Sequence, residues 1–180
     1  MVAGLSSNEA GRAFRTSEIM EAGDLVFVHS NKLIGRVIQL GERLRWNKLD
    51  ARYNHVAIID RVEGDKAFVI QAEAKGVTND KELTTLSADG SFIVVPLPAA
   101  CDRQKVLAFA RAQVGSKYGW LSIASVALDI LTPSFFPLFR RNNSWICSAV
   151  AAESLRFGGW FYSWPDVYTV TPAQLFASLN

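Results

Sequence analysis

Apolar and polar positions along four short stretches of this chain follow the patterns of β-strands. These stretches are rich in β-branched and aromatic residues and cover 24–29, 56–62, 66–72 and 92–97. Only Glu63-Gly64-Asp65 separates the second stretch from the third, and a three-residue connection with a central glycine is typical of a β-hairpin. The pattern therefore predicts an antiparallel sheet built from the first half of the chain.

Elsewhere, and mostly in the second half, the apolar residues recur at helical spacing. Helices are predicted over 33–44, 103–114, 120–131, 145–157 and 172–179. Asp102 is a suitable N-cap for the second of these helices, and Ser144 or Asn143 for the fourth. Thr171 and Gln174 form a capping box at the last. Strands followed by helices are typical of an α+β fold, in which helices pack on one antiparallel sheet.

Length, composition and charge are those of one ordinary globular domain. The chain has 180 residues, of which 49% are hydrophobic and 20% charged, and its net charge is +2. Since no repeat or linker is visible, we expect an N-terminal arm over 1–22 and a single domain over 23–180. A net charge so close to zero predicts no strong attraction to nucleic acid.

The N-terminus lacks the apolar run of a signal peptide. The most apolar window, 120–139, is interrupted by one aspartate and two prolines, whereas a spanning helix needs about 20 uninterrupted apolar residues. We therefore expect a cytoplasmic protein, which would reach an external target through lysis or carriage in a particle. Arg140 and Arg141 follow the window directly, so a contact with a membrane surface stays open. Segment 133–143 is a lid, a membrane contact or a plain loop.

Cysteine and histidine are scarce, and each residue can be weighed individually. The chain contains only Cys101, Cys147, His29 and His55. This set excludes a disulfide-built scaffold and a histidine-rich metal site. Glycine-rich nucleotide motifs, H-E-x-x-H, paired C-x-x-C and the G-x-S-x-G of serine hydrolases are all missing from the sequence. We expect no metal and no cofactor.

His55 stands at the start of the predicted hairpin. A register symmetric about Gly64 places it directly opposite Glu73, with the two Cβ atoms about 5 Å apart. A carboxylate there would fix the tautomer of the imidazole and leave its other nitrogen as a base. A slip of one residue would put the two side chains on opposite faces of the hairpin. The alternatives for this orienting role are Asp80, Asp60 and Asn54.

Cys147 is the candidate nucleophile. With Ser144 as N-cap it occupies the third position of its helix, where unpaired N–H groups and the helix dipole favour a thiolate. Such help matters because a free thiol is ionised by only a few per cent at neutral pH. The alternative is that Cys147 is a small buried core residue, as we expect for Cys101.

Five segments, in this order along the chain, resemble the NlpC/P60 superfamily. They are Gly23-Asp24-Leu25-Val26-Phe27, Asn54-His55-Val56-Ala57-Ile58-Ile59, Glu73 with Gly76-Val77, Gly115-Ser116-Lys117-Tyr118-Gly119, and Trp145-Ile146-Cys147-Ser148. Histidine and acid precede the cysteine, the reverse of the usual order. The chain therefore resembles the circularly permuted branch, the YiiX/YebB-like papain-fold enzymes, with lecithin retinol acyltransferase as a more distant relative. The resemblance covers roughly 23–157 and implies a permuted papain-like fold.

By this resemblance Cys147 is the nucleophile, His55 the base and Glu73 the residue that orients it. Tyr118 and Ser148 are then candidates for contacts to the oxyanion or the substrate. The implied reaction is hydrolysis of an amide or peptide bond through a thioester acyl-enzyme. The implied substrate is a peptide, such as a cell-wall peptide or an amidated or lipidated protein terminus.

Two other functions remain open. Aromatic residues gather between 135 and 168, and they suit either a packed core or the acyl-chain groove of a lipase-like acyltransferase. The third function is that of a binding or structural module that keeps the fold without turnover.

Overall fold

The computed structural model describes residues 20–29, 53–86, 92–119, 144–161, 167 and 170–179. The helices predicted over 33–44 and 120–131, the segment 133–143 and most of the N-terminal arm lie outside these residues. Every residue assigned above to the site is among those described.

An antiparallel sheet of five strands forms one layer of the protein. Its strands are β1 (Leu25–Val28), β2 (His55–Glu63), β3 (Lys66–Glu73), β4 (Gly76–Glu82) and β5 (Phe92–Val95). They lie in the order β4-β3-β2-β1-β5, with every neighbouring pair antiparallel. The four predicted strands are confirmed. The hydrophobic pattern does not reveal β4, because it is an edge strand of mostly polar residues, followed by the short helix η2 (Leu83–Thr85).

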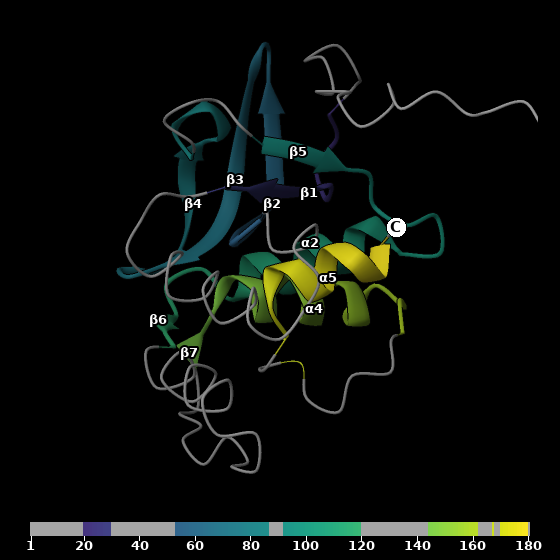
Figure 1. Cartoon of the computed structure of the whole chain (residues 1–180). Coiled ribbons are helices and arrows are strands. Elements are labelled where there is room, and N and C mark those ends of the chain that lie inside the picture. Colours follow the sequence, from purple (N-terminus) through teal and green to yellow (C-terminus); the bar gives the residue numbers. More distant parts are fainter. Residues whose placement is uncertain are drawn as a thin grey trace, which may run out of the picture.

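Helices of the described part cover one face of this sheet (Figure 1). They are α2 (Arg103–Ala112), α4 (Cys147–Phe157) and α5 (Pro172–Leu179). α4 packs against β2 and β3 and against both other helices. A second, small sheet pairs β6 (Lys117–Tyr118) in parallel with β7 (Ser144–Trp145), directly before α4. The architecture is the α+β arrangement that the sequence predicts.

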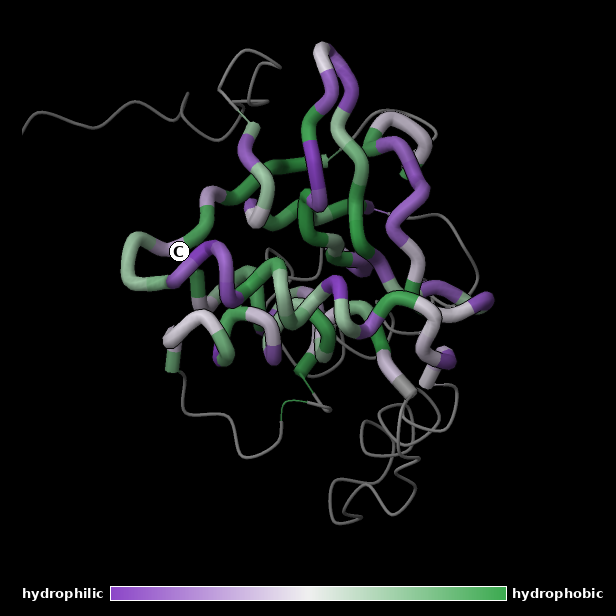
Figure 2. Tube along the Cα trace, turned by 180° about the vertical axis from the view of Figure 1, so that it is seen from behind, coloured by the Kyte–Doolittle hydropathy of each residue, from purple (hydrophilic) through white to green (hydrophobic). Residues whose placement is uncertain are grey.

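Side chains of the central strands alternate between two apolar clusters, one on each face of the sheet. The cluster between sheet and helices includes Leu25, Phe27, Val56, Ile58 and Cys147. The cluster on the other face includes Val26, Val28, Ala57 and Ile59. Because both faces are buried, β1 and much of β2 read as continuous apolar runs. Figure 2 shows much of these strands as hydrophobic, whereas the outer end of the β2–β3 hairpin is mostly hydrophilic.

The predicted caps of α2 and α5 are confirmed. The Asp102 carboxylate accepts a hydrogen bond from the backbone N–H of Lys105 at 3.1 Å. At α5 the N–H of Thr171 donates to Gln174 Oε1 at 2.9 Å, and the N–H of Gln174 donates to Thr171 Oγ1 at 3.2 Å. Each cap satisfies N–H groups that have no partner within the helix, which is worth about 1 kcal/mol.

The turn of the β2–β3 hairpin is one residue shorter than predicted. Glu63 pairs with Lys66, so only Gly64 and Asp65 connect the strands. Gly64 has φ +63°, a left-handed conformation that two-residue hairpin turns require and that glycine adopts at little cost.

A β-bulge in β2 changes the register farther from the turn. Asp60 is an extra residue with no partner of its own on β3. Beyond it Ile58 pairs with Ile70, as the predicted register symmetric about Gly64 requires. Continued to the end of the strand, this register places His55 opposite Glu73.

Candidate active site

Cys147 lies at the N-terminus of α4, where the chain leaves the small sheet. Ile146 is the N-cap and Ser144 belongs to β7, so the prediction that Ser144 or Asn143 caps this helix is wrong. Cys147 is therefore the first residue of the helix rather than the third. The isoleucine side chain contains no hydrogen-bond acceptor, so the first N–H groups of the helix stay available beside the thiol. Cys147 is only 7% exposed.

The imidazole of His55 and the thiol of Cys147 shift each other's pKa. Burial alone would raise the pKa of Cys147, but the charge and hydrogen bond of His55, together with the backbone N–H groups of Val56 and Ser148, lower it. Burial alone would lower the pKa of His55, but the charge and hydrogen bond of Cys147 and the hydrogen bond of Gln71 raise it. Both directions favour a thiolate beside an imidazolium.

Gln71 on β3 holds the imidazole from its other side. Its Oε1 atom lies 2.9 Å from His55 Nε2, and the residue is 2% exposed. A carbonyl oxygen only accepts hydrogen bonds, so in this pairing Nε2 carries the proton and Nδ1 is left for Cys147. Among the described residues the Nε2 atom of Gln71 is buried with no hydrogen-bond partner.

Gln71 is absent from the residues that the sequence assigns to the site. A neutral amide within an apolar strand carries no charge signal that would draw attention to it. The predicted register does point to Gln71. If His55 lies opposite Glu73, then Gln71, two positions before Glu73 on the same strand, shares that face and lies diagonally across from His55, within reach of a long side chain.

Glu73 acts on the pair through its charge. It is partly buried at the end of β3, and it is the last of the causes that raise the pKa of His55. The acceptor for the hydrogen bond of His55 Nε2 is Oε1 of Gln71 rather than the carboxylate of Glu73. Of the alternative residues, Asp60 binds Arg111, Asp80 is exposed on β4 and Asn54 is buried directly before β2.

Tyr118 on β6 completes one side of the site. Burial raises the pKa of its phenol far above the usual value, and the negative charges of Cys147 and Glu73 raise it further. The phenol therefore stays neutral and keeps its proton as a hydrogen-bond donor. Tyr118 pairs with Trp145 across the small sheet, and this pairing brings β6 next to the residues that open α4.

The Ser148 hydroxyl points elsewhere. Its Oγ atom donates to the carbonyl oxygen of Val170 at 2.5 Å, and the residue is 1% exposed. The side chain is thus committed to holding the segment that leads into α5. What Ser148 supplies near the thiol is its backbone N–H, which helps to lower the pKa of Cys147.

The second cysteine and the aromatic residues Phe109, Trp145, Phe157 and Phe161 are assigned no role in the site. Burial raises the pKa of Cys101, which is therefore a poorer nucleophile than a free thiol. Trp145 meets Phe109 edge-on, with ring centroids 5.9 Å apart, within the core. Phe157 and Phe161 are 56% and 82% exposed, but Phe157 is the last residue of α4 and Phe161 follows it, whereas Cys147 is the first residue of that helix. These described aromatics therefore do not form a groove beside the thiol.

The described residues contain no group of three or more histidine, cysteine, aspartate or glutamate side chains placed to hold a metal ion. No helix of the described part is both long enough and apolar enough to cross a membrane. The apolar window 120–139 lies outside that part.

Comparison with known proteins gives a likeness of fold. No family model matches the chain, and no curated protein matches it significantly. Among solved structures, the chain is similar to the crystal structure of the metalloprotein YiiX from Escherichia coli O157:H7, with a TM-score of 0.51 and 17% identity over 77% of this chain. The match covers 66% of YiiX, so this chain spans just under two-thirds of that structure. The protein thus has an α+β fold similar to that of YiiX.

Proposed function

We propose that this chain is a thiol hydrolase that cleaves an amide or peptide bond with Cys147 as its nucleophile. One observation carries the proposal: the Cys147 thiol at the start of α4 is hydrogen-bonded to the His55 imidazole inside the protein, and each group shifts the other's pKa toward its charged form. A cysteine that merely fills space needs no imidazole held by a buried amide. Titratable groups with such mutual shifts are characteristic of catalytic sites.

The proposed reaction begins when the Cys147 thiolate attacks the carbonyl carbon and forms a C–S bond. The tetrahedral oxyanion collapses, the C–N bond breaks, and the His55 imidazolium gives its proton to the leaving amine. Neutral His55 then takes a proton from water as the water attacks the thioester. The C–S bond breaks, the acid leaves, and thiolate and imidazolium are restored.

The surrounding residues have distinct roles in this proposal. Gln71 keeps the imidazole in one orientation and holds the proton on Nε2. The N–H groups of the first turn of α4 stabilise the oxyanion, and the neutral phenol of Tyr118 is a further donor on that side. In other enzymes, losing one such donor slows the reaction by roughly 10²–10³-fold.

The resemblance to permuted papain-fold enzymes supports this choice of reaction class, and the likeness to YiiX supports the fold on which it rests. The favoured substrate is a peptide, such as a cell-wall peptide or a modified protein terminus. The lipid-ester alternative has less support, because the exposed aromatics of the described part lie at the far end of α4 from Cys147.

The test is the pH dependence of Cys147 alkylation by iodoacetamide, with Cys101→Ser as the common background. The intact protein and its His55→Ala variant are compared by mass spectrometry. We expect wild type to react with an apparent pKa well below about 8.5, the value of a free thiol, and His55→Ala to raise it. Equal profiles in both proteins, typical of a buried thiol, would instead favour the binding module and remove the proposed activity.

A reactive thiol is then examined for acyl transfer. A p-nitrophenyl ester should give a burst of p-nitrophenol and a mass increase equal to one acyl group on Cys147. Cys147→Ser on the same background is the control, and it should give neither signal.

A further inference from the structure

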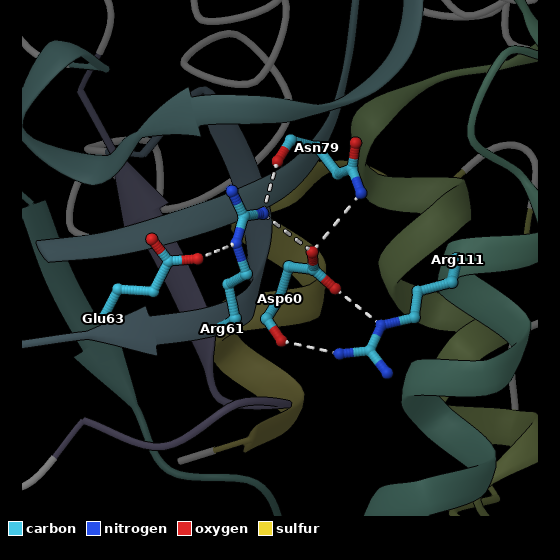
Figure 3. A network of polar contacts seen from close by, with 5 residues as sticks. All are labelled: Asp60, Arg61, Glu63, Asn79 and Arg111. Atoms are coloured by element: carbon cyan, nitrogen blue, oxygen red, sulfur yellow. Dashed lines mark hydrogen bonds and ion pairs between the residues drawn. The ribbon is translucent and has the colours of Figure 1, made fainter.

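A polar network around Asp60 joins three elements of the fold (Figure 3). Arg111 of α2 donates from Nε to Asp60 Oδ1 at 2.7 Å and from Nη2 to the Asp60 carbonyl oxygen at 2.9 Å. Arg61 Nη1 donates to Oδ2 at 3.2 Å and to the carbonyl oxygen of Asn79 at 3.1 Å. The Nδ2 atom of Asn79 lies 3.4 Å from Oδ2. Asp60 itself is 4% exposed, while Glu63 holds the outer edge of Arg61.

The network lies where two strands each contain an extra residue. Asp60 is the bulged residue of β2. On the other side of β3, Asn79 and Asp80 of β4 together face the single residue Ile70. The contacts of Asp60 and Arg61 with Asn79 therefore fasten together two bulges that flank the same stretch of β3.

These bulges determine which residues meet at the site. If the register of the turn continued without the bulge, His55 would lie opposite Ala74 and Gln71 would point to the other face. With the bulge, His55 and Gln71 share a face and form their hydrogen bond. The bulge of β4 likewise sets the position of Val77, whose N–H donates to the carbonyl oxygen of Ser116 at 3.0 Å just before β6.

We propose that Asp60 and Arg111 are positioning residues of the proposed active site, because their ion pair holds the register in which Gln71 reaches His55. The inference rests on the proposed function and deepens it. A bulge leaves its extra residue without ladder partners, and Arg111 satisfies both the freed carbonyl oxygen and the buried carboxylate of Asp60. Neither residue touches the reacting atoms.

The other end of α2 supplies a matched control. Arg103 donates from Nη1 to Oδ1 of Asp24 at 3.0 Å, and Asp24 is also 4% exposed. This ion pair ties the same helix to the sheet through the residue before β1, outside the bulged strands. Breaking it removes a comparable ion pair to a buried aspartate and leaves every contact of Asp60 with Arg111, Arg61 and Asn79 in place.

The experiment compares Arg111→Met, Asp60→Asn and Arg103→Met on the Cys101→Ser background. Stability is followed by urea unfolding, and the site is followed by Cys147 alkylation across pH. We expect Arg111→Met and Asp60→Asn to slow alkylation at pH 6 by at least about threefold, equivalent to half a pKa unit. Arg103→Met should lose similar stability and keep the wild-type profile. Equal effects of the two arginine variants, or an unchanged profile in Arg111→Met, would overturn the inference.

A second readout separates this inference from the proposed function. At a pH above the pKa of His55, where the ring is neutral, NMR of the ring nitrogens reports whether the remaining proton is on Nε2, whatever the reactivity of Cys147. Loss of this form in Arg111→Met but not in Arg103→Met supports the inference, and an unchanged tautomer refutes it. If Arg111→Met does not fold, Arg111→Lys keeps the charge and removes the paired hydrogen bonds, and the same two outcomes decide.

Discussion

The side-chain oxygen of Gln71 lies 2.9 Å from Nε2 of His55, and this hydrogen bond leaves Nδ1 for the thiol of Cys147. The holding group is a buried amide rather than the carboxylate of Glu73. An amide fixes the ring without adding a charge to the core. A full carboxylate at the same place would pull the imidazolium toward itself and compete with the thiolate for it.

Replacing Gln71 tests this relationship. Gln71→Leu keeps the volume but removes the acceptor, so the pKa of His55 should fall and that of Cys147 should rise. Since a hydrogen bond to a charged group contributes about 1.5–3 kcal/mol, the expected change is about one to two pKa units. Gln71→Glu should shift the pKa of His55 in the opposite direction. Proton NMR titration of the His55 ring measures its pKa in both Gln71 variants, with His29→Gln in the background so that one histidine remains. If Gln71→Leu leaves the pKa of His55 unchanged, Gln71 is not the group that holds the imidazole.

The pH dependence of acyl transfer should differ between leaving groups. The lowered pKa of Cys147 means that the thiolate is lost only as pH falls through that lowered value. The raised pKa of His55 means that the imidazolium is lost only as pH rises above its ordinary range. An anilide needs both forms and should give a bell-shaped profile, whereas a p-nitrophenyl ester needs only the thiolate. The measurement is the stopped-flow acylation rate across pH for an anilide and a p-nitrophenyl ester that carry the same acyl group. Identical pH profiles for the two substrates would exclude His55 as the acid that protonates the leaving group.

The sequence predicts most of the fold because most elements carry their own local signal. β1, β2, β3 and β5 have apolar or β-branched runs, and α2 and α5 have cap residues that the structure confirms. β6 and β7 have only two residues each and carry no such run. β4 escapes notice because an edge strand with the sequence Gly-Val-Thr-Asn-Asp-Lys-Glu has no buried face over most of its length. Ser144 is a good N-cap by propensity, but pairing of β7 with β6 recruits it into a strand, and tertiary context overrides the local preference.

The site is predicted less completely than the fold, because one of its contacts depends on the register between β2 and β3. His55 and Cys147 stand out as scarce residue types at a strand start and a helix start. Gln71 does not stand out, and its pairing depends on an extra residue at Asp60 that no local pattern reveals. A bulge is recognised from the partners of both strands, and these are known only once the sheet has formed.

Ser148→Ala should separate a structural role from a role in the site. Its hydroxyl satisfies the carbonyl oxygen of Val170, so removing it leaves a buried acceptor unpaired and costs about 1–3 kcal/mol. The apparent pKa of Cys147 should not change, because the backbone N–H of Ser148 remains. Ser154→Ala is the matched control on the same helix: its hydroxyl binds the carbonyl oxygen of Val150, which helix geometry already pairs. Urea unfolding should show a larger loss of stability for Ser148→Ala than for Ser154→Ala. A changed alkylation profile of Cys147 in Ser148→Ala would instead mean that the hydroxyl acts in the site.

Adding a single methyl group at Gly76 should disturb the site. A Cβ atom there would lie 2.5 Å from the carbonyl oxygen of Ser116, and its φ of +117° is a conformation that other residues rarely adopt. Gly64 also has a positive φ, but a Cβ atom on it meets no atom within 4 Å. Both alanine variants therefore pay for backbone strain, of about 1–3 kcal/mol, and only Gly76→Ala adds a collision with backbone.

The collision reaches Cys147 through connected backbone. Displacing Ser116 moves β6, which pairs with β7, and β7 leads directly into α4. We expect Gly76→Ala to lose at least about 1 kcal/mol more stability than Gly64→Ala in urea unfolding, because a buried overlap adds to the strain. At a denaturant concentration where both variants stay folded, only Gly76→Ala should shift the alkylation profile of Cys147 toward that of a free thiol. If both variants keep the wild-type profile, the small sheet does not position the thiol, and the packing of α4 on β2 and β3 is sufficient to place it.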